Sequence, residues 1–238
     1  MRISPLGDRA LLIDVGGRID AETLARVRDV IARLEQAAMP GVTDIVPGYT
    51  SVAVHYDPCD VLARLRAGRD AQPSRLMRTA IEQALARPAG HAPADASDVV
   101  EIPVVYGGAQ GPDLGHVAAL HGMEPGEIAA LHASVTYTVH LIGFVPGFPY
   151  LGGLDPRLAT PRRESPRAHV PAGSVAIGGE QTGVYPVDSP GGWQLIGRTP
   201  LALFDATRSP PALLRVGDRV RFRPIDDAGY LRLMAGRT

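Results

Sequence analysis

The run VTYTVHLIGFVPGFPYLGGLDP, residues 135–156, decides the fold of the second half of this chain. Apolar and polar residues alternate from Val135 to Ile142, which is typical of a half-buried β-strand. Glycine, proline and aromatic residues crowd the rest of the run, a composition that indicates turns between short strands. Further on, Val220 and Phe222 alternate with arginines after a Gly-Asp turn. Short strands separated by turn residues predict a β-barrel or a β-sandwich.

The residues before this run predict a mixed α+β region. The N-terminal segments comprise a strand over 10–15, a helix over 20–38 capped by Asp20, two strands around the Pro47-Gly48 turn, and helices over 61–68 and 74–86. A strand over 99–106 and two short helices broken at Gly122 are expected next. The segment RPAGHAPADASD, residues 87–98, has no apolar period and indicates a linker. We therefore expect an α+β N-terminal domain over residues 1–90 and a mainly β domain over residues 91–238.

Composition excludes several functional classes. The chain has 238 residues, 45% hydrophobic and 21% charged, and a net charge of −1, so no overall field attracts nucleic acid or anionic membranes. One cysteine excludes an internal disulfide, and the absence of lysine excludes a Walker-type loop, a Schiff base and a biotin attachment site. No stretch approaches the about 20 apolar residues of a membrane span. We expect a soluble, cytoplasmic protein.

Most familiar catalytic patterns are missing from the sequence. The helix pair within 111–134 lacks the basic side chains of a DNA-reading helix. The histidines have no metal-ligand spacing and are expected at the surface, so we predict no protein-bound metal. No G-x-S-x-G elbow occurs, and hydroxyls such as those of Ser174 and Ser189 in glycine-rich loops often close turns. Cys59 is expected to be an incidental thiol.

A proline-stiffened arginine loop is the strongest candidate site. The segment TPRRESPRAHVPAG, residues 160–173, holds three arginines among prolines, and fixed guanidinium groups bind carboxylate or phosphate well. A solvated charged loop is the alternative reading. The predicted substrate- or nucleotide-binding residues are Phe144, Pro146, Gly147, Phe148, Tyr150, Arg162, Arg163, Arg167, Ser174, Gln181, Thr182, Tyr185, Ser189, Trp193 and Arg198. This set suits a small anionic amide or carboxylate ligand.

These same residues carry a family resemblance. The segment from Gly143 to Asp205 closely resembles the KipI and allophanate hydrolase subunit 1 family, whose bacterial members are described as the B subunit of 5-oxoprolinase, PxpB. The segments over 41–58, 105–114 and 213–225 extend the resemblance to essentially the whole chain. The chain departs from the family pattern at Ala109 and Gln110, where an acidic and an aromatic residue are expected, so no catalytic role is assigned there. Asp113 still matches.

The resemblance implies a fold, partners and a reaction. The second domain would be a cyclophilin-like β-barrel, and the chain would act in a heteromeric complex with a homologous, KipA-like (AHS2) partner and a LamB/YcsF-like partner. That complex hydrolyses 5-oxoproline to glutamate with ATP and Mg²⁺ as co-substrates, without a tightly bound cofactor, and the chain is expected to be inactive alone. No general base can be assigned. The alternatives are a KipI-like inhibitor of a sensor histidine kinase and a carboxyltransferase component of the allophanate hydrolase or urea carboxylase type.

Overall fold

The chain folds into two compact units, residues 1–96 and 97–238. The computed structural model describes residues 1–65, 68, 70–87 and 98–236. Each unit has its own hydrophobic core. The expected domain boundary between residues 90 and 91, and most of the expected linker, lie outside the described residues.

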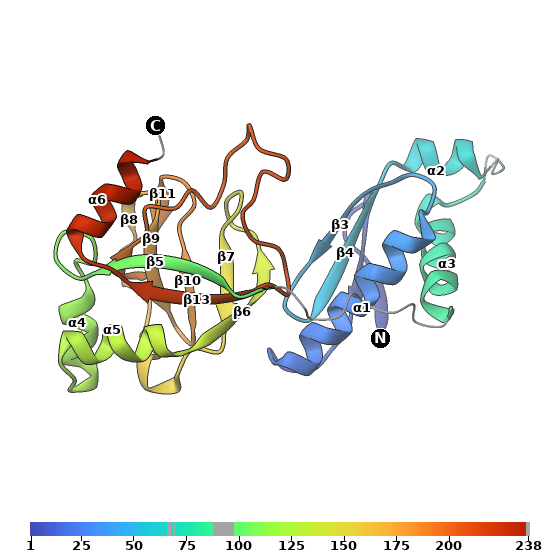
Figure 1. Ribbon diagram of the computed structural model, residues 1–238. Coiled ribbons are helices and arrows are strands. Elements are labelled where there is room, and N and C mark those ends of the chain that lie inside the picture. Colours follow the sequence, from blue (N-terminus) through green and yellow to red (C-terminus); the bar gives the residue numbers. More distant parts are fainter. Residues whose placement is uncertain (66–67, 69, 88–97, 237–238) are drawn as a thin grey trace. The chain divides into compact units, whose positions relative to one another are not determined.

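The N-terminal unit is a four-stranded antiparallel sheet with helices packed against it (Figure 1). The strand order is β1-β2-β4-β3, with β1 (Arg2–Pro5), β2 (Ala10–Asp14), β3 (Val42–Pro47) and β4 (Ser51–Tyr56). The sequence alternation in β4 is confirmed, because Val52, Val54 and Tyr56 are buried and the residues between them are partly exposed. The buried side chains form the core beneath the helices.

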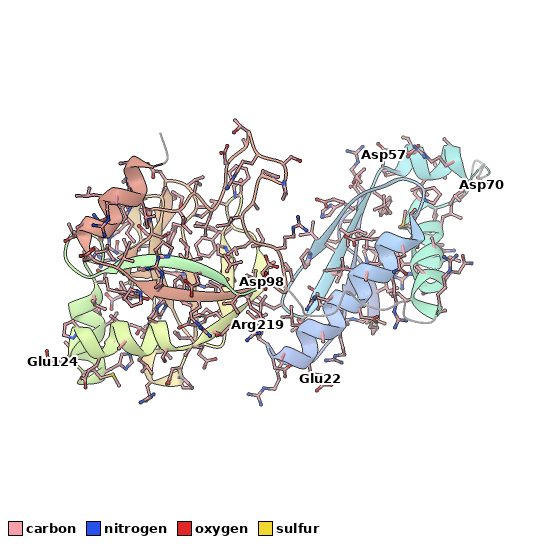
Figure 2. The ribbon with its side chains drawn as sticks, viewed as in Figure 1. Glu22, Asp57, Asp70, Asp98, Glu124 and Arg219 are labelled. Carbon is pink, nitrogen blue, oxygen red and sulfur yellow. The ribbon has the colours of Figure 1, made fainter. Side chains whose placement is uncertain are left out.

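Side-chain caps set the starts of two helices in this unit. The helices are α1 (Ala21–Ala37), α2 (Pro58–Arg64) and α3 (Pro73–Ala86). The predicted cap of α1 is confirmed, since the Asp20 carboxylate accepts a hydrogen bond of 2.8 Å from the Thr23 backbone N–H. Asp57, labelled at the start of α2 in Figure 2, accepts from the backbone N–H groups of Cys59 and Asp60. Cys59 itself is exposed.

The C-terminal unit is a closed barrel, which confirms the predicted barrel class. Around the barrel the order is β10-β7-β6-β13-β5-β12-β9, and β13 pairs with β5 in parallel whereas the other pairs are antiparallel. Its strands are β5 (Val100–Tyr106), β6 (Thr136–Ile142), β7 (Pro149–Gly152), β9 (Ser174–Gly178), β10 (Gln181–Val184), β12 (Gln194–Arg198) and β13 (Arg219–Pro224). The predicted burial of Val220 and Phe222 is confirmed.

Shorter elements surround the barrel (Figure 1). They are α4 (Leu114–His121), α5 (Pro125–Ser134), α6 (Asp227–Ala235), the 3₁₀ helix η1 (Pro156–Leu158), and a two-stranded sheet of β8 (Arg167–Val170) and β11 (Ser189–Gly191). The predicted break at Gly122 is confirmed, because this residue ends α4 with a φ of 63°. Glu124, labelled in Figure 2, and Glu127 form the capping box that starts α5.

Two histidines expected at the surface are buried. His132 on α5 is fully buried and stacks on Phe222 at 4.6 Å between ring centroids, because α5 packs against β13. His140 is 8% exposed and packs over Gly152, at the point where the β6–β7 register shifts between Val139 and Leu141. The expectation of surface positions is therefore wrong for both residues.

Two features are absent from the described residues, a helix that could span a membrane and a side-chain cluster that could hold a metal ion. Within that part of the chain, no helix has the combined length and apolar character that a bilayer span requires. The same residues contain no group of three or more His, Cys, Asp or Glu side chains able to hold a metal ion. The lack of a bound metal stays a prediction.

Candidate functional site

An aromatic cluster lies on the outer face of the barrel. Along β9, Val175 and Ile177 belong to the interior core, whereas Ala176 packs into a second cluster. Because neighbouring strand residues face opposite sides, this second cluster lies outside the barrel. Its buried members are Phe148, Val170, Ala176, Tyr185, Trp193 and Leu195.

Strand glycines make room for these aromatic rings. A Cβ added at Gly178 would lie 2.5 Å from the indole of Trp193, and one at Gly183 would lie 2.9 Å from the ring of Phe148. Gly183 therefore serves packing within the protein. A protein ring, rather than a ligand, fills the space that its missing side chain leaves.

The first hollow above this cluster is termed the aromatic pocket. It has a volume of about 310 Å³. Its lining consists of Phe144, Phe148, Tyr150, Arg162, Arg163, Pro166, Tyr185, Pro190, Gly191, Gly192 and Trp193. The five aromatic side chains that the sequence places here are thus gathered in one wall, together with two of the predicted arginines.

Phe144 is the exposed edge of that wall. Its side chain is 60% exposed, and its ring lies edge-on to Phe148 with 5.7 Å between centroids. Its φ of 70° places it in the left-handed region, which is a strained conformation for a bulky residue. Strain of this kind, of about 1–3 kcal/mol, is concentrated at functional sites in proteins. An exposed, strained aromatic at a pocket mouth is a candidate ligand contact.

A second hollow, termed the polar pocket, shares part of the arginine loop with the aromatic pocket. It has a volume of about 670 Å³. Its lining consists of Asp113, His116, Leu120, Thr160, Pro161, Arg162, Arg163, Glu164, Ser165 and Gln194. Arg162 and Arg163 line both pockets and so form a cationic ridge between them. The Arg162 guanidinium carbon lies 5.7 Å from the centroid of Trp193, within cation–π range.

Asp113 ties the arginine loop to the barrel. The carboxylate is 8% exposed and accepts hydrogen bonds of 2.7 Å from Arg167 Nη2 and from the Leu195 backbone N–H. A nitrogen of Arg163 lies 3.5 Å from the same carboxylate. Buried charges need such partners, because water no longer solvates them. Arg167, predicted as a ligand cation, therefore has a positioning role through Nη2, although its buried Nη1 has no hydrogen-bond partner in the structure.

Gln194 presents an unpaired acceptor at the wall of the polar pocket. Its side chain is 4% exposed, and Nε2 donates to the Pro161 carbonyl oxygen at 3.0 Å. Only the amide nitrogen can donate to a carbonyl, so this contact fixes the orientation of the amide. Oε1 is left buried without a donor. A buried acceptor in this state costs about 1–3 kcal/mol, which a ligand N–H would recover.

The phenols in the aromatic pocket have raised pKa values. Burial raises the pKa of Tyr150 and of Tyr185, the latter against an opposing backbone hydrogen bond at Trp193. Both phenols are consequently neutral at neutral pH, and act there as hydrogen-bonding groups rather than as bases.

Other predicted site residues lie elsewhere. The prediction for Thr182 is wrong: this fully buried residue donates to the Ala176 carbonyl oxygen and contacts His132 Nε2 inside the barrel. Ser174 is buried and its hydroxyl closes a turn by donating to the Pro171 carbonyl oxygen at 2.7 Å, so ligand contact by this residue stays a prediction.

Five more predicted residues line neither pocket in the described structure. Gly147 packs against Phe204, and Pro146 beside it is exposed. Arg198 donates through Nε to the Ala172 carbonyl oxygen at 2.9 Å. Gln181 begins β10, and Ser189 begins β11 with a buried hydroxyl that has no partner. Ligand contact by these residues stays a prediction.

The sequence reading missed much of the polar pocket. Asp113, His116, Thr160 and Gln194 come from separate segments that only the fold brings together. The signal for Asp113 was present in the GPD motif, but a lone aspartate before a helix also serves as a helix cap. The other three residues had no spacing that could have indicated a shared site.

Comparison with known proteins agrees with this architecture. Residues 1–214 match the family described as "Carboxyltransferase domain, subdomain C and D". The chain is 44% identical over 229 residues to the B subunit of 5-oxoprolinase from Bacillus subtilis, covering 96% of this chain and 95% of that protein. It is 46% identical to the protein of the same name from Escherichia coli O157:H7, over 92% of this chain and 94% of that protein.

Solved structures share the fold. The crystal structure of TTHA0988 superposes with a TM-score of 0.74 at 38% identity over 92% of this chain, which spans 40% of that longer chain. The urea amidolyase of K. lactis gives a TM-score of 0.72 at 19% identity over 98% of this chain and 15% of that chain, which shows the fold alone.

Proposed function

This chain belongs to the family of 5-oxoprolinase B subunits, and we propose that it is a component of an ATP-dependent 5-oxoprolinase. The complex would convert 5-oxoproline, ATP and water to L-glutamate, ADP and phosphate. The chain acts with a homologous KipA-like partner and a LamB/YcsF-like partner, and is inactive alone. The observation that carries this proposal is the similarity to the Bacillus subtilis protein over nearly the whole of both chains.

The chemistry requires activation of the lactam. Amide resonance makes the ring carbonyl a poor electrophile, so direct attack by water is slow. In the proposed step, the lactam oxygen forms a bond to the γ-phosphorus of ATP, and the bond from that phosphorus to ADP breaks with its electron pair on ADP. Water then adds to the activated ring carbon, the C–N bond opens, and phosphate leaves, giving glutamate. Magnesium arrives with ATP and neutralises phosphate charge.

Arg162 and Arg163 supply the charge stabilisation that this step needs. Phosphoryl transfer depends mainly on positioning and on cations near the transferring group. Both side chains are exposed at the ridge between the pockets, and Arg163 is 37% exposed. Asp113 fixes the loop that bears them through Arg167. A fixed pair of guanidinium groups is a suitable site for a phosphoryl group that carries several negative charges.

Reconstitution tests the proposed function. The chain is purified with its KipA-like and LamB/YcsF-like partners and supplied with ATP, Mg²⁺ and 5-oxoproline, and glutamate and ADP are measured. We expect turnover that needs all three proteins and the lactam. A complex that assembles but shows no lactam-dependent turnover would remove the proposal and leave the kinase-inhibitor and carboxyltransferase alternatives for direct assay.

Replacing one ridge arginine tests the assignment of the site. Arg163→Ala should lower kcat/KM of the reconstituted complex by about 100-fold, because a donor to developing charge is lost. The control is Arg223→Ala, which removes an arginine from an exposed ion pair with Glu101 and leaves both pocket linings unchanged. Wild-type kcat/KM in a folded Arg163→Ala complex would remove the anion-site assignment.

A further inference from the structure

We propose that the two pockets hold the two reactants, with the purine base of ATP in the aromatic pocket, 5-oxoproline in the polar pocket, and the γ-phosphate between them at Arg162 and Arg163. The inference rests on the proposed function. It adds which pocket binds which reactant and names the contacts that distinguish them.

The aromatic pocket has the chemistry of a base site. Its wall presents aromatic rings, with Phe144, Tyr150 and Trp193 among them, and two prolines complete it. A purine is a flat ring system with apolar faces, and such rings stack readily on aromatic side chains. The volume of about 310 Å³ lies at the lower end of the range of about 300–1,000 Å³ for small-molecule sites. The exposed ring of Phe144 is free to stack on one face of the base.

The polar pocket matches the lactam instead. 5-Oxoproline has a ring N–H, a ring carbonyl and a carboxylate, so it needs one acceptor and at least two donors. Gln194 Oε1 is the buried acceptor without a donor, and the arginine ridge provides the donors. Oε1 is buried in the free protein, so the pocket wall must rearrange before the lactam N–H can reach it. As the ring oxygen bonds to phosphorus, positive charge grows on the ring nitrogen and strengthens this hydrogen bond.

The shared ridge explains how the reactants would meet. Arg162 and Arg163 line both hollows, so a phosphate chain leaving the aromatic pocket passes over them toward the polar pocket. The Arg162 guanidinium also sits against Trp193, which fixes one cation beside the base site. Two reactants held at one shared cationic ridge would be close enough to be aligned for in-line transfer.

Kinetics of the reconstituted complex separate the two pockets. Phe144→Ala should raise KM for ATP by about 10-fold and leave KM for the lactam unchanged. Gln194→Met should raise KM for the lactam and leave KM for ATP unchanged, because it keeps the side-chain length but removes the acceptor, together with the Nε2 donor to Pro161. Leu231→Ala, which truncates an apolar side chain that is 66% exposed on α6, is the matched control and should change neither value.

A substrate analogue keeps the test valid if Gln194→Met perturbs folding. The lactone analogue of 5-oxoproline has a ring oxygen in place of N–H. With the wild-type complex its inhibition constant should exceed the KM for the lactam by about 10-fold, since the Gln194 acceptor stays unpaired. Equal binding of lactone and lactam by the wild type would overturn the assignment of the polar pocket.

The outcomes distinguish this inference from the proposed function. Suppose that the wild type turns over but each substitution raises KM for both ATP and the lactam, or that Phe144→Ala raises only KM for the lactam and Gln194→Met only KM for ATP. The pocket assignment then fails, and the proposed function stands. If Phe144→Ala instead weakens assembly with the KipA-like partner while KM for ATP is unchanged, the aromatic pocket is a protein-docking surface and the inference is wrong. Absent turnover removes the proposed function and the pocket assignment together.

Discussion

At the scale of single residues, Asp113 determines the geometry of the candidate site. One carboxylate receives the Arg167 guanidinium and the backbone N–H of Leu195, and so joins the arginine loop to β12. Without it, the loop that bears Arg162 and Arg163 would be held by its prolines, by the Gln194 amide on the Pro161 carbonyl oxygen and by the backbone N–H of Arg163 on Gly192. The cationic ridge between the pockets therefore depends on a residue whose own carboxylate is engaged within the protein.

Asp113→Asn should destabilise the C-terminal unit by about 2–4 kcal/mol, because it leaves Arg167 and a buried N–H without a full partner. Chemical denaturation followed by the fluorescence of Trp193, the single tryptophan, measures the change. The matched control is Glu101→Gln, since the exposed pair of Glu101 with Arg223 should contribute about 0–1 kcal/mol. Equal, small effects of both substitutions would show that Asp113 does not hold the loop.

Sequence patterns predicted the composition of the site better than its geometry. The aromatic and arginine segments are continuous in the chain, so Phe144, Phe148 and Arg162 could be placed together by composition and resemblance. Thr182 could not be excluded, because the sequence does not show which face of a short barrel strand points inward when both faces are buried. Gln194 and Thr160 could not be found, since their proximity depends on the closure of the barrel.

At the scale of elements, the histidine on α5 fastens this helix (Pro125–Ser134) to the barrel. The Thr182 hydroxyl donates to the Ala176 carbonyl oxygen, so it must accept from His132 Nε2–H, at 2.8 Å. The other ring nitrogen of His132, Nδ1, therefore carries no proton and accepts from the Tyr106 hydroxyl, also at 2.8 Å. The ring is thus neutral and satisfied on both nitrogens. The Tyr137 hydroxyl also donates to the His132 carbonyl oxygen at 2.7 Å. The helix pair thus packs against the barrel core.

This burial predicts a pH dependence of stability. Burial lowers the pKa of His132 from 6.5 to about 3. Between these two pH values the imidazole is protonated in the unfolded chain but neutral in the folded chain. Stability is therefore complete above about pH 6.5 and is lost as the pH falls toward 3, by about 2–3 kcal/mol between pH 7 and 4.5. His132→Gln should lose this part of the pH dependence in denaturation experiments, whereas the exposed His169→Gln should keep it. Parallel curves for wild type and His132→Gln would contradict the assignment.

Helices and strands were predicted correctly where the hydrophobic periodicity and the capping or turn residues indicate the same boundaries. The helix after Asp20, the break at Gly122 and the strand over 219–224 follow from local rules, and the structure confirms them. The bulge at His140 was not predictable, because a register shift depends on the neighbouring strand β7 (Pro149–Gly152). The parallel pairing of β13 with β5 is likewise a property of barrel closure rather than of either sequence.

At the scale of the whole molecule, the chain builds two separate cores. Leu34 on α1 (Ala21–Ala37) belongs to the N-terminal core, whereas Ile177 on β9 (Ser174–Gly178) belongs to the barrel core. Both side chains are almost fully buried, at 1% and 0% exposure. The single tryptophan, Trp193, reports only on the barrel unit. The two cores can therefore be probed separately in the intact chain.

Leu34→Ala should destabilise the N-terminal unit by about 2–5 kcal/mol, through lost apolar contact and the cavity left behind. Far-UV circular dichroism should then show an earlier loss of helix, while the denaturation midpoint from Trp193 fluorescence stays at the wild-type value, because the truncated side chain belongs to the N-terminal core. Ile177→Ala, the matched substitution in the barrel, should shift the fluorescence midpoint instead. A common shift of both signals in Leu34→Ala would mean that the two units unfold as one cooperative body, since only coupling between them could carry the effect of Leu34 to Trp193.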